Sequence, residues 1–121
     1  MQRRVVITGM GAVTAIGNSK KEYWEGLLEG RNGAENITRF DASKHATKFG
    51  AEVKNFSPEN VIDHRETRRM DLYTQFAMVA AHEAIEDSGL DLDKIDLDMA
   101  GVVVGSGIGG ILSFEVEHGK F

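Results

Sequence analysis

A run of glycines carries the strongest chemical signal in the sequence. Residues 105–110 read Gly-Ser-Gly-Ile-Gly-Gly and follow the apolar run Val102–Val104. The glycine spacing matches the dinucleotide-binding fingerprint, in which backbone N–H groups receive a pyrophosphate. It also matches a tight turn at which a substrate or a second subunit comes close to the main chain. The fingerprint usually lies in the first βα unit, with an acidic residue about 20 positions later. This late match therefore favours the structural turn over nucleotide binding.

Three arginines form the second candidate site. Arg68 and Arg69 follow Arg65 at three and four residues, so a helix would place the three guanidinium groups on one face. Such a face suits an anionic partner, either a phosphate group or an acidic protein surface. Asp63 and Glu66 neutralise part of the charge, and a solvated helix face is the ordinary interpretation of mixed charges. The spacing alone leaves both interpretations open.

Metal binding and local catalysis find little support. The four histidines are scattered along the chain without a zinc-binding spacing. The chain has no cysteine, which excludes disulfides, thiolate metal sites and a cysteine nucleophile from these residues. We therefore expect no metal site, and the histidines suggest no specific Ser/His/Asp arrangement.

Composition sets the broad class of the protein. Of its 121 residues, 41% are hydrophobic and 27% charged, which is typical of a globular domain. The net charge of −5 argues against nucleic-acid binding. No apolar run approaches the ~20 residues of a membrane span, and no signal-peptide core follows the start. We expect a cytoplasmic protein.

Two βα units are predicted to position the candidate residues. An apolar strand over residues 4–8 leads into a loop that begins like a phosphate loop, but Thr14 stands where the third glycine would lie. Ser19 and Glu22 form a capping box for a helix that Gly30 ends. Near the other end, the Val102–Val104 run predicts a strand buried on both faces, and a short helix follows the glycines.

The middle of the chain connects these units. We expect a short strand near residues 49–53, a helix start at Ser57-Pro58 and a long helix from Leu72 to Ser88, closed by Gly89. The order βα…αβα predicts a layered α/β fold rich in parallel strands. The chain has no internal boundary and ends after one short helix. We therefore expect it to be the N-terminal portion of a longer protein.

Taken together, these motifs resemble the start of the elongating β-ketoacyl-acyl carrier protein synthases of type II. The resemblance runs from residue 3 to about residue 118. It rests on Arg3-Arg-Val-Val-Ile-Thr-Gly-Met-Gly11, Phe40-Asp41, Ala46-Thr-Lys-Phe49, Arg68-Arg-Met-Asp71, Asp87-Ser-Gly-Leu90 and Gly105-Ser-Gly-Ile-Gly-Gly110. It implies a thiolase-like fold of α-β-α-β-α layers, of which residues 1–121 supply the opening part of the first half. It also implies a homodimer that uses no cofactor.

The resemblance also implies a chemistry. In the family, a cysteine takes an acyl chain from the carrier protein and two histidines help to decarboxylate malonyl carrier protein. The resulting carbanion attacks the thioester, in a decarboxylating Claisen condensation. Those three residues match positions beyond residue 121, so the parent is expected to be an acyltransferase and this chain alone inactive.

Two functional features of the family match residues of this chain. Ile108, between Gly107 and Gly109, matches the residue at the closed end of the acyl pocket. Arg65, Arg68 and Arg69 match the basic patch that receives the acidic carrier protein. Two alternatives remain open: a nucleotide-binding α/β module that uses Gly105–Gly110, and a non-catalytic relative that acts as a scaffold.

Overall fold

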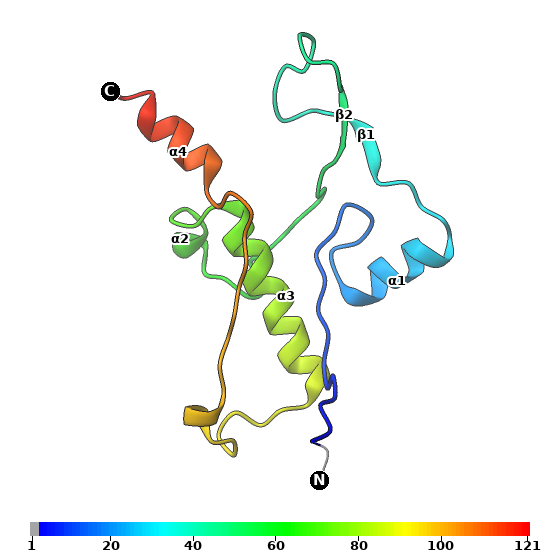
Figure 1. Ribbon diagram of the computed structural model, residues 1–121, viewed down its shortest axis with the longest axis vertical. Coiled ribbons are helices and arrows are strands. Elements are labelled where there is room, and N and C mark those ends of the chain that lie inside the picture. The colour runs from blue at the N-terminus through cyan, green and yellow to red at the C-terminus, as the bar shows by residue number, and fades with distance from the viewer. Residues whose placement is uncertain (1–2) are drawn as a thin grey trace.

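The computed structural model describes residues 3–121 as an open arrangement around one long helix (Figure 1). The elements in chain order are α1 (Lys20–Leu28), β1 (Ala34–Asn36), β2 (Phe49–Ala51), α2 (His64–Thr67), α3 (Leu72–Ser88), a 3-10 turn (Leu97–Met99) and α4 (Ile111–His118). The long helix α3 forms the axis of the structure. Helix α1 and the β1–β2 pair lie to one side of it, and α4 projects from the end opposite the N-terminus.

The predicted helix boundaries agree with the structure where a cap residue marks them. Ser19 is the N-cap of α1, and its hydroxyl accepts a hydrogen bond from the Glu22 amide at 3.2 Å. The Glu22 carboxylate reaches one residue further back than a capping box requires, to the Asn18 amide at 2.8 Å. Gly30 and Gly89 have φ of 66° and 64°, the left-handed conformation that ends a helix. The predicted helix over residues 72–88 is confirmed in full as α3.

The two apolar strands are the main correction to the sequence predictions. Residues 4–8 and 102–104 are extended but pair with no strand among the described residues, and Val103 is 99% exposed. The sheet that does form is the antiparallel pair of β1 and β2, in which Glu35 lies opposite Gly50. A strand is stable only where a second backbone completes its hydrogen bonds. Neither apolar run finds such a partner within residues 3–121, so the expected parallel pairing does not form.

The segment before α2 also differs from the prediction. Ser57-Pro58 begins a single turn instead of a helix, in which the Pro58 carbonyl accepts hydrogen bonds from the amides of Val61 and Ile62, both at 2.9 Å. The short helix α2 starts later and is capped by Asp63, whose carboxylate accepts a hydrogen bond from the Arg65 amide at 2.7 Å. Proline and aspartate thus mark two successive turns rather than one helix.

The N-terminal segment packs closely against α3. A Cβ on Gly9 would lie 2.1 Å from the Ala84 carbonyl oxygen, and a Cβ on Gly11 would lie 1.9 Å from that of Ala80. Both glycines are therefore required for close packing, which explains them without a phosphate ligand.

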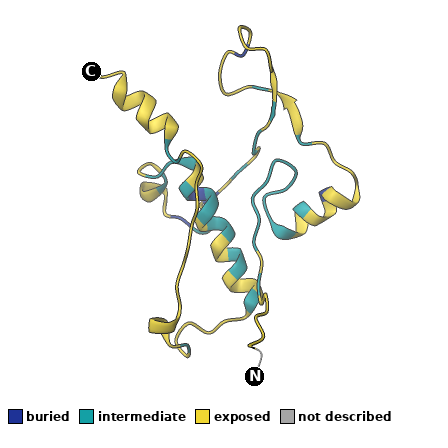
Figure 2. Cartoon of the chain, in the orientation of Figure 1, coloured by how far each residue is buried: buried dark blue, intermediate teal, exposed yellow. Residues whose placement is uncertain are grey.

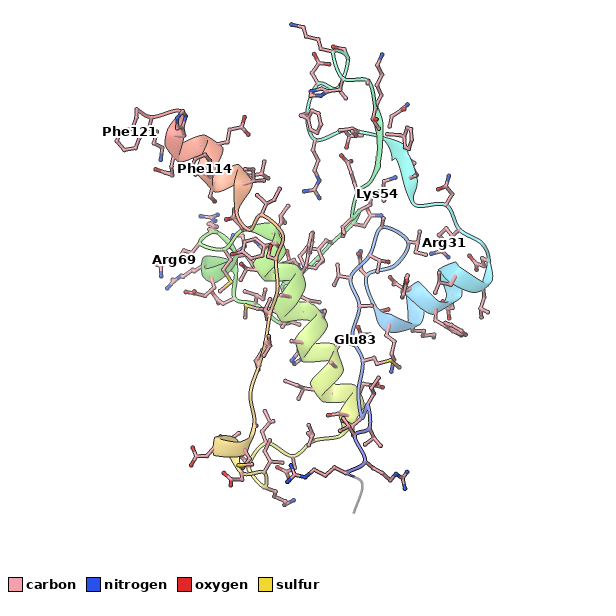
Figure 3. The ribbon with its side chains drawn as sticks, viewed as in Figure 1. Arg31, Lys54, Arg69, Glu83, Phe114 and Phe121 are labelled. Atoms are coloured by element: carbon pink, nitrogen blue, oxygen red, sulfur yellow. The ribbon has the colours of Figure 1, made fainter. Side chains whose placement is uncertain are left out.

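Two carboxylates of α3 secure the same segment. Asp87 accepts a hydrogen bond from the Met10 amide at 3.0 Å and pairs with Lys20. Glu83 accepts from the Ala12 amide at 2.9 Å and from the Lys20 amide at 2.8 Å. Figure 3 labels Glu83 where the N-terminal segment passes α3. These backbone N–H groups find side-chain acceptors in place of a neighbouring strand.

Few side chains are buried. Ala42, Pro58, Ile62 and Gln75 are buried, and Figure 2 shows the half-buried residues concentrated along α3 and the loop before α1. Many large apolar side chains remain in solvent, Val5, Val102 and Phe114 among them. Among the described residues, no helix is both long enough and apolar enough to cross a membrane.

Candidate functional site

The glycine turn, residues 105–110, lies at the end of α3 that carries α4. Gly109 has a φ of 76°, which an L side chain rarely adopts, and its amide donates a hydrogen bond to the Ser106 hydroxyl at 3.0 Å. Added Cβ atoms at Gly105 and Gly107 would meet nothing within 4 Å. The backbone is therefore constrained at Gly109, whereas there is space for a side chain at Gly105 and Gly107.

Ile108 lies within this turn and is 78% exposed. The cavity beside the turn has a volume of about 80 Å³ and is lined by the neighbouring Gly109 and Gly110, by Asp71 and Tyr73 at the start of α3, and by Arg39. Ile108 is not among the residues that line it. Its side chain is therefore largely in solvent.

Asp71 joins the start of α3 to the glycine turn. Its carboxylate accepts a hydrogen bond from the Ser113 hydroxyl at 2.6 Å, across 42 positions of sequence. A Cβ on Gly110 would lie 1.8 Å from Asp71 Oδ2, so a larger residue at this position would require the Asp71 carboxylate to move. The same carboxylate lies against Gly110, the N-cap of α4, which is the end of a helix that favours phosphate groups. A negative charge at that position opposes nucleotide binding by Gly105–Gly110.

Sequence reasoning did not single out Asp71 as a functional residue. The available signal was its position directly before a long helix, within the motif Arg68-Arg-Met-Asp71. An aspartate there predicts a helix cap, but its side chain makes no capping hydrogen bond to α3. The carboxylate bonds to α4 instead, and no local pattern reveals a contact across 42 residues.

The arginine turn, residues 65–69, includes most of α2 and the two residues that follow it. The amide of Arg69 donates to the Glu66 carbonyl at 2.9 Å, and Arg68 keeps helical dihedral angles at the C-cap. The three arginines therefore share one helical turn, as their spacing predicts. All three residues are exposed. Figure 3 shows Arg69 pointing away from α3 on the side opposite α1.

Neighbouring side chains partly occupy the arginine turn. Arg69 lies 3.6 Å from the Glu66 carboxylate, and both side chains are about half exposed or more. Arg68 Nη2 lies 3.2 Å from His64 Nε2. Such exposed pairs contribute little, typically ~0–1 kcal/mol, and exchange readily for a better partner. Asp63, the other nearby acid, is engaged in capping α2.

The histidines do not gather into a site. His82 lies 3.4 Å from Glu86 one turn along α3, and His64 contacts Arg68. His45 and His118 pack against Phe40 and Phe114, with ring centroids 5.5 Å and 5.9 Å apart. Over residues 3–121 no group of three or more potential ligands could hold a metal ion.

The sequence as a whole identifies the family. A model of the β-ketoacyl synthase N-terminal domain matches residues 2–119. The chain belongs to this family. The β-ketoacyl synthase resemblance inferred from the motifs is therefore confirmed, and the helices and small sheet form part of an α/β fold.

Two curated relatives extend this match. The 3-oxoacyl-[acyl-carrier-protein] synthase 2 of Synechocystis sp. is 48% identical over 117 residues, which cover 97% of this chain and 28% of the relative. The synthase of the same name from Staphylococcus aureus (strain COL) is 50% identical over 116 residues, 96% of this chain and 28% of the relative. This β-ketoacyl synthase chain thus spans about 28% of the length of the relatives it matches.

Solved structures agree with the family assignment. "The ishigamide ketosynthase/chain length factor" superposes with a TM-score of 0.69 at 40% identity, over 78% of this chain and 24% of that chain. "AntDE:AntF (apo): type II PKS acyl-carrier protein in complex with its ketosynthase bound to the hexaketide" gives a TM-score of 0.58 at 25% identity, over 79% and 25%. The thiolase-like fold class predicted from sequence is shown by these ketosynthase neighbours.

Proposed function

We propose that this chain is the N-terminal portion of a 3-oxoacyl-acyl carrier protein synthase that elongates fatty acyl chains. The observation that carries the proposal is the identity of about 50%, spread over nearly the whole chain, with relatives of that name. The parent would be a cytoplasmic homodimer and an acyltransferase. It would catalyse the decarboxylating condensation of an enzyme-bound acyl group with malonyl carrier protein.

The chemistry of the parent needs a nucleophile that this chain does not contain. A thioester intermediate requires a thiolate, and the sequence has no cysteine. The nucleophile and the groups that stabilise the developing carbanion would come from the part of the relatives beyond this match. The role of this chain would be to receive the carrier protein and to border the acyl pocket.

The arginine turn is the proposed docking surface for acyl carrier protein. Its three cations share one exposed helical turn, and their present partners are exposed side chains that a carrier-protein carboxylate can replace. The AntDE:AntF structure holds an acyl carrier protein against its ketosynthase, which supports docking of this kind. Ile108 on the glycine turn would border the acyl chain, with Gly107 and Gly109 giving the backbone room to move.

Charge reversal in the full-length enzyme tests the docking proposal. Changing Arg65, Arg68 and Arg69 together to Glu should raise the KM for carrier-protein substrates at least tenfold and weaken its salt dependence. Turnover of small thioester mimics should remain within twofold of the unchanged enzyme. A matched control reverses three other exposed cations, Lys21, Lys94 and Lys120, each of which pairs with an acid three or four residues away. Equal losses on both kinds of substrate would contradict the docking role.

Acylation experiments test the proposal that the nucleophile lies outside this chain. Incubation of the 121-residue chain with acyl carrier protein thioesters should give no covalent acyl adduct by mass spectrometry, whereas the full-length enzyme should be acylated. If the full-length protein also fails to take up acyl groups, it is a non-catalytic relative that acts as a scaffold.

A further inference from the structure

Three elements meet where α3 begins: the arginine turn, the glycine turn and α4 (Figure 1). Asp71 stands at this meeting point, two residues after Arg69 and at the N-cap of α3. We propose that Asp71 is a positioning residue that fixes the glycine turn, and with it Ile108, relative to the arginine turn. This inference rests on the proposed function. It assigns to the proposed site a residue that connects the arginine turn with the glycine turn.

The side chain of Asp71 does not cap α3, although Asp71 is the N-cap residue of that helix. At the N-cap its carboxylate would accept a hydrogen bond from an amide in the first turn of α3. That bond is absent, and the backbone carbonyl of Asp71 alone accepts the helical amides of Thr74 and Gln75, at 3.0 and 3.2 Å. The carboxylate is thereby left to bond Ser113 in the first turn of α4.

The position of the carboxylate also suits α4 electrostatically. Gly110 is the N-cap of α4 and has no side chain to satisfy the free amides of the first turn. The Asp71 carboxylate lies against Gly110, so its negative charge faces the positive end of this eight-residue helix. A charge, a hydroxyl hydrogen bond and a close backbone approach therefore all connect Asp71 to the segment that follows Ile108.

On its other side, the start of α3 is tied to the arginine turn. The Gln75 side-chain amide, only 8% exposed, donates to the carbonyls of Thr67 and Met70, both at 2.9 Å. These carbonyls flank Arg68 and Arg69. The first turn of α3 thus holds the arginine turn through Gln75 and the glycine turn through Asp71.

The consequence is a specific role in acyl selection. Removing the Asp71 carboxylate frees the glycine turn, so the position of Ile108 becomes less defined and discrimination between long and short acyl chains weakens. In the full-length enzyme, D71A should change the ratio of kcat/KM for long-chain over short-chain acyl carrier protein donors by about fivefold or more, the lower range of typical coupling effects. D71N keeps an oxygen that accepts from Ser113 and should recover most of the ratio.

A double-mutant cycle with S113A isolates the proposed contact. S113A alone should change the ratio in the same direction, and adding it to D71A should change nothing further. D91A is the matched control, since within residues 3–121 the Asp91 carboxylate contacts only Lys94 and its own turn. Equal loss of kcat for both donors in D71A, or full additivity with S113A, would overturn the positioning role.

Amide hydrogen exchange tests the Asp71 contact whether or not the unchanged enzyme is active. D71A and S113A should each speed exchange at Gly109 and Ile111 at least tenfold, with α3 amides beyond its first turn unaffected. Unchanged exchange at both amides would refute the tether. If the unchanged enzyme condenses neither donor, the proposed function fails, while the exchange result still decides the structural role of Asp71.

Discussion

Two extended segments run along α3, and they differ sharply in how they contact it. The N-terminal segment lies so close that a methyl group on Gly11 would meet the Ala80 carbonyl at 1.9 Å. The Val102–Val104 segment is separated from α3 by a cavity of about 290 Å³, lined by Tyr73, Met78 and three smaller residues of the helix.

The difference shows what an apolar extended segment needs in order to become part of a fold. Glu83 and Asp87 of α3 give the amides of Ala12 and Met10 acceptors within this chain. The amides of Val102 to Val104 have no such acceptor among the described residues, and their side chains are 61–99% exposed. Burial of apolar surface alone does not order a backbone whose hydrogen bonds are unmade. If the proposed longer enzyme exists, we expect it to supply the strand partner that these valines lack.

The largest expected effect comes from adding a methyl group at Gly11, where the N-terminal segment lies against α3. Gly11→Ala should lower the free energy of local opening at the Ala12 amide by about 2–4 kcal/mol, because the new methyl group meets backbone that cannot yield. Hydrogen exchange measures this directly. Gly101→Ala is the matched control: its methyl group would meet nothing within 4 Å, and it should have no effect. A tolerated Gly11→Ala would show that the packing is looser than described.

A smaller loss should follow when the acceptor is removed. Glu83→Ala leaves the amides of Ala12 and Lys20 without their partner, at an expected cost of about 1–3 kcal/mol in the same exchange measurement. Glu86 lies three residues after Glu83 and pairs with His82. Glu86→Ala should therefore leave the exchange rates of the Ala12 and Lys20 amides unchanged. Similar effects from both changes would mean that general helix charge matters rather than the specific contact.

The pH dependence of the packed segment should be weaker still. The hydrogen bond from Lys20 and that from the Met10 amide lower the pKa of Asp87 below its ordinary value. A lowered pKa in the folded state gives stability that is present above the ordinary aspartate pKa of about 3.9 and is lost as pH falls through the lower value. Protection of the Met10 amide should therefore decline in that acidic range. Lys20→Met should move the decline to higher pH, and an unchanged profile would contradict the role of Lys20.

The smallest effect is expected in the other segment. Val103→Thr should leave the stability of the 121-residue chain unchanged, because the side chain is 99% exposed. In the full-length enzyme the same change should cost on the order of 1 kcal/mol, as expected for a buried valine. Urea unfolding of both forms provides the comparison. A measurable loss in the 121-residue chain would mean that Val103 is already buried there.

These contrasts also explain which features the sequence could predict. Helix boundaries followed from local caps, namely Ser19, Gly30 and Gly89, whose effects act within one turn. The grouping of Arg65, Arg68 and Arg69 followed from helical spacing. Strand formation at Val102–Val104 depends on a partner backbone outside the local pattern, so composition predicted a strand that this chain alone does not complete.

The contacts made by acidic side chains were the least predictable part of the site. Glu83 and Asp71 each bond residues more than 40 positions away, and each sits where a helix surface residue or a cap would be expected. Their roles follow from which backbone groups lack a partner, and only the arrangement in space shows that.

Hydrogen exchange at Val102, Val103 and Val104 tests the central claim most directly. The account predicts that these amides exchange freely in the 121-residue chain while those of Met10 and Ala12 are protected, and that all five are protected in the full-length enzyme. Protection of the three valine amides in the 121-residue chain, or their free exchange in the full-length enzyme, would contradict it.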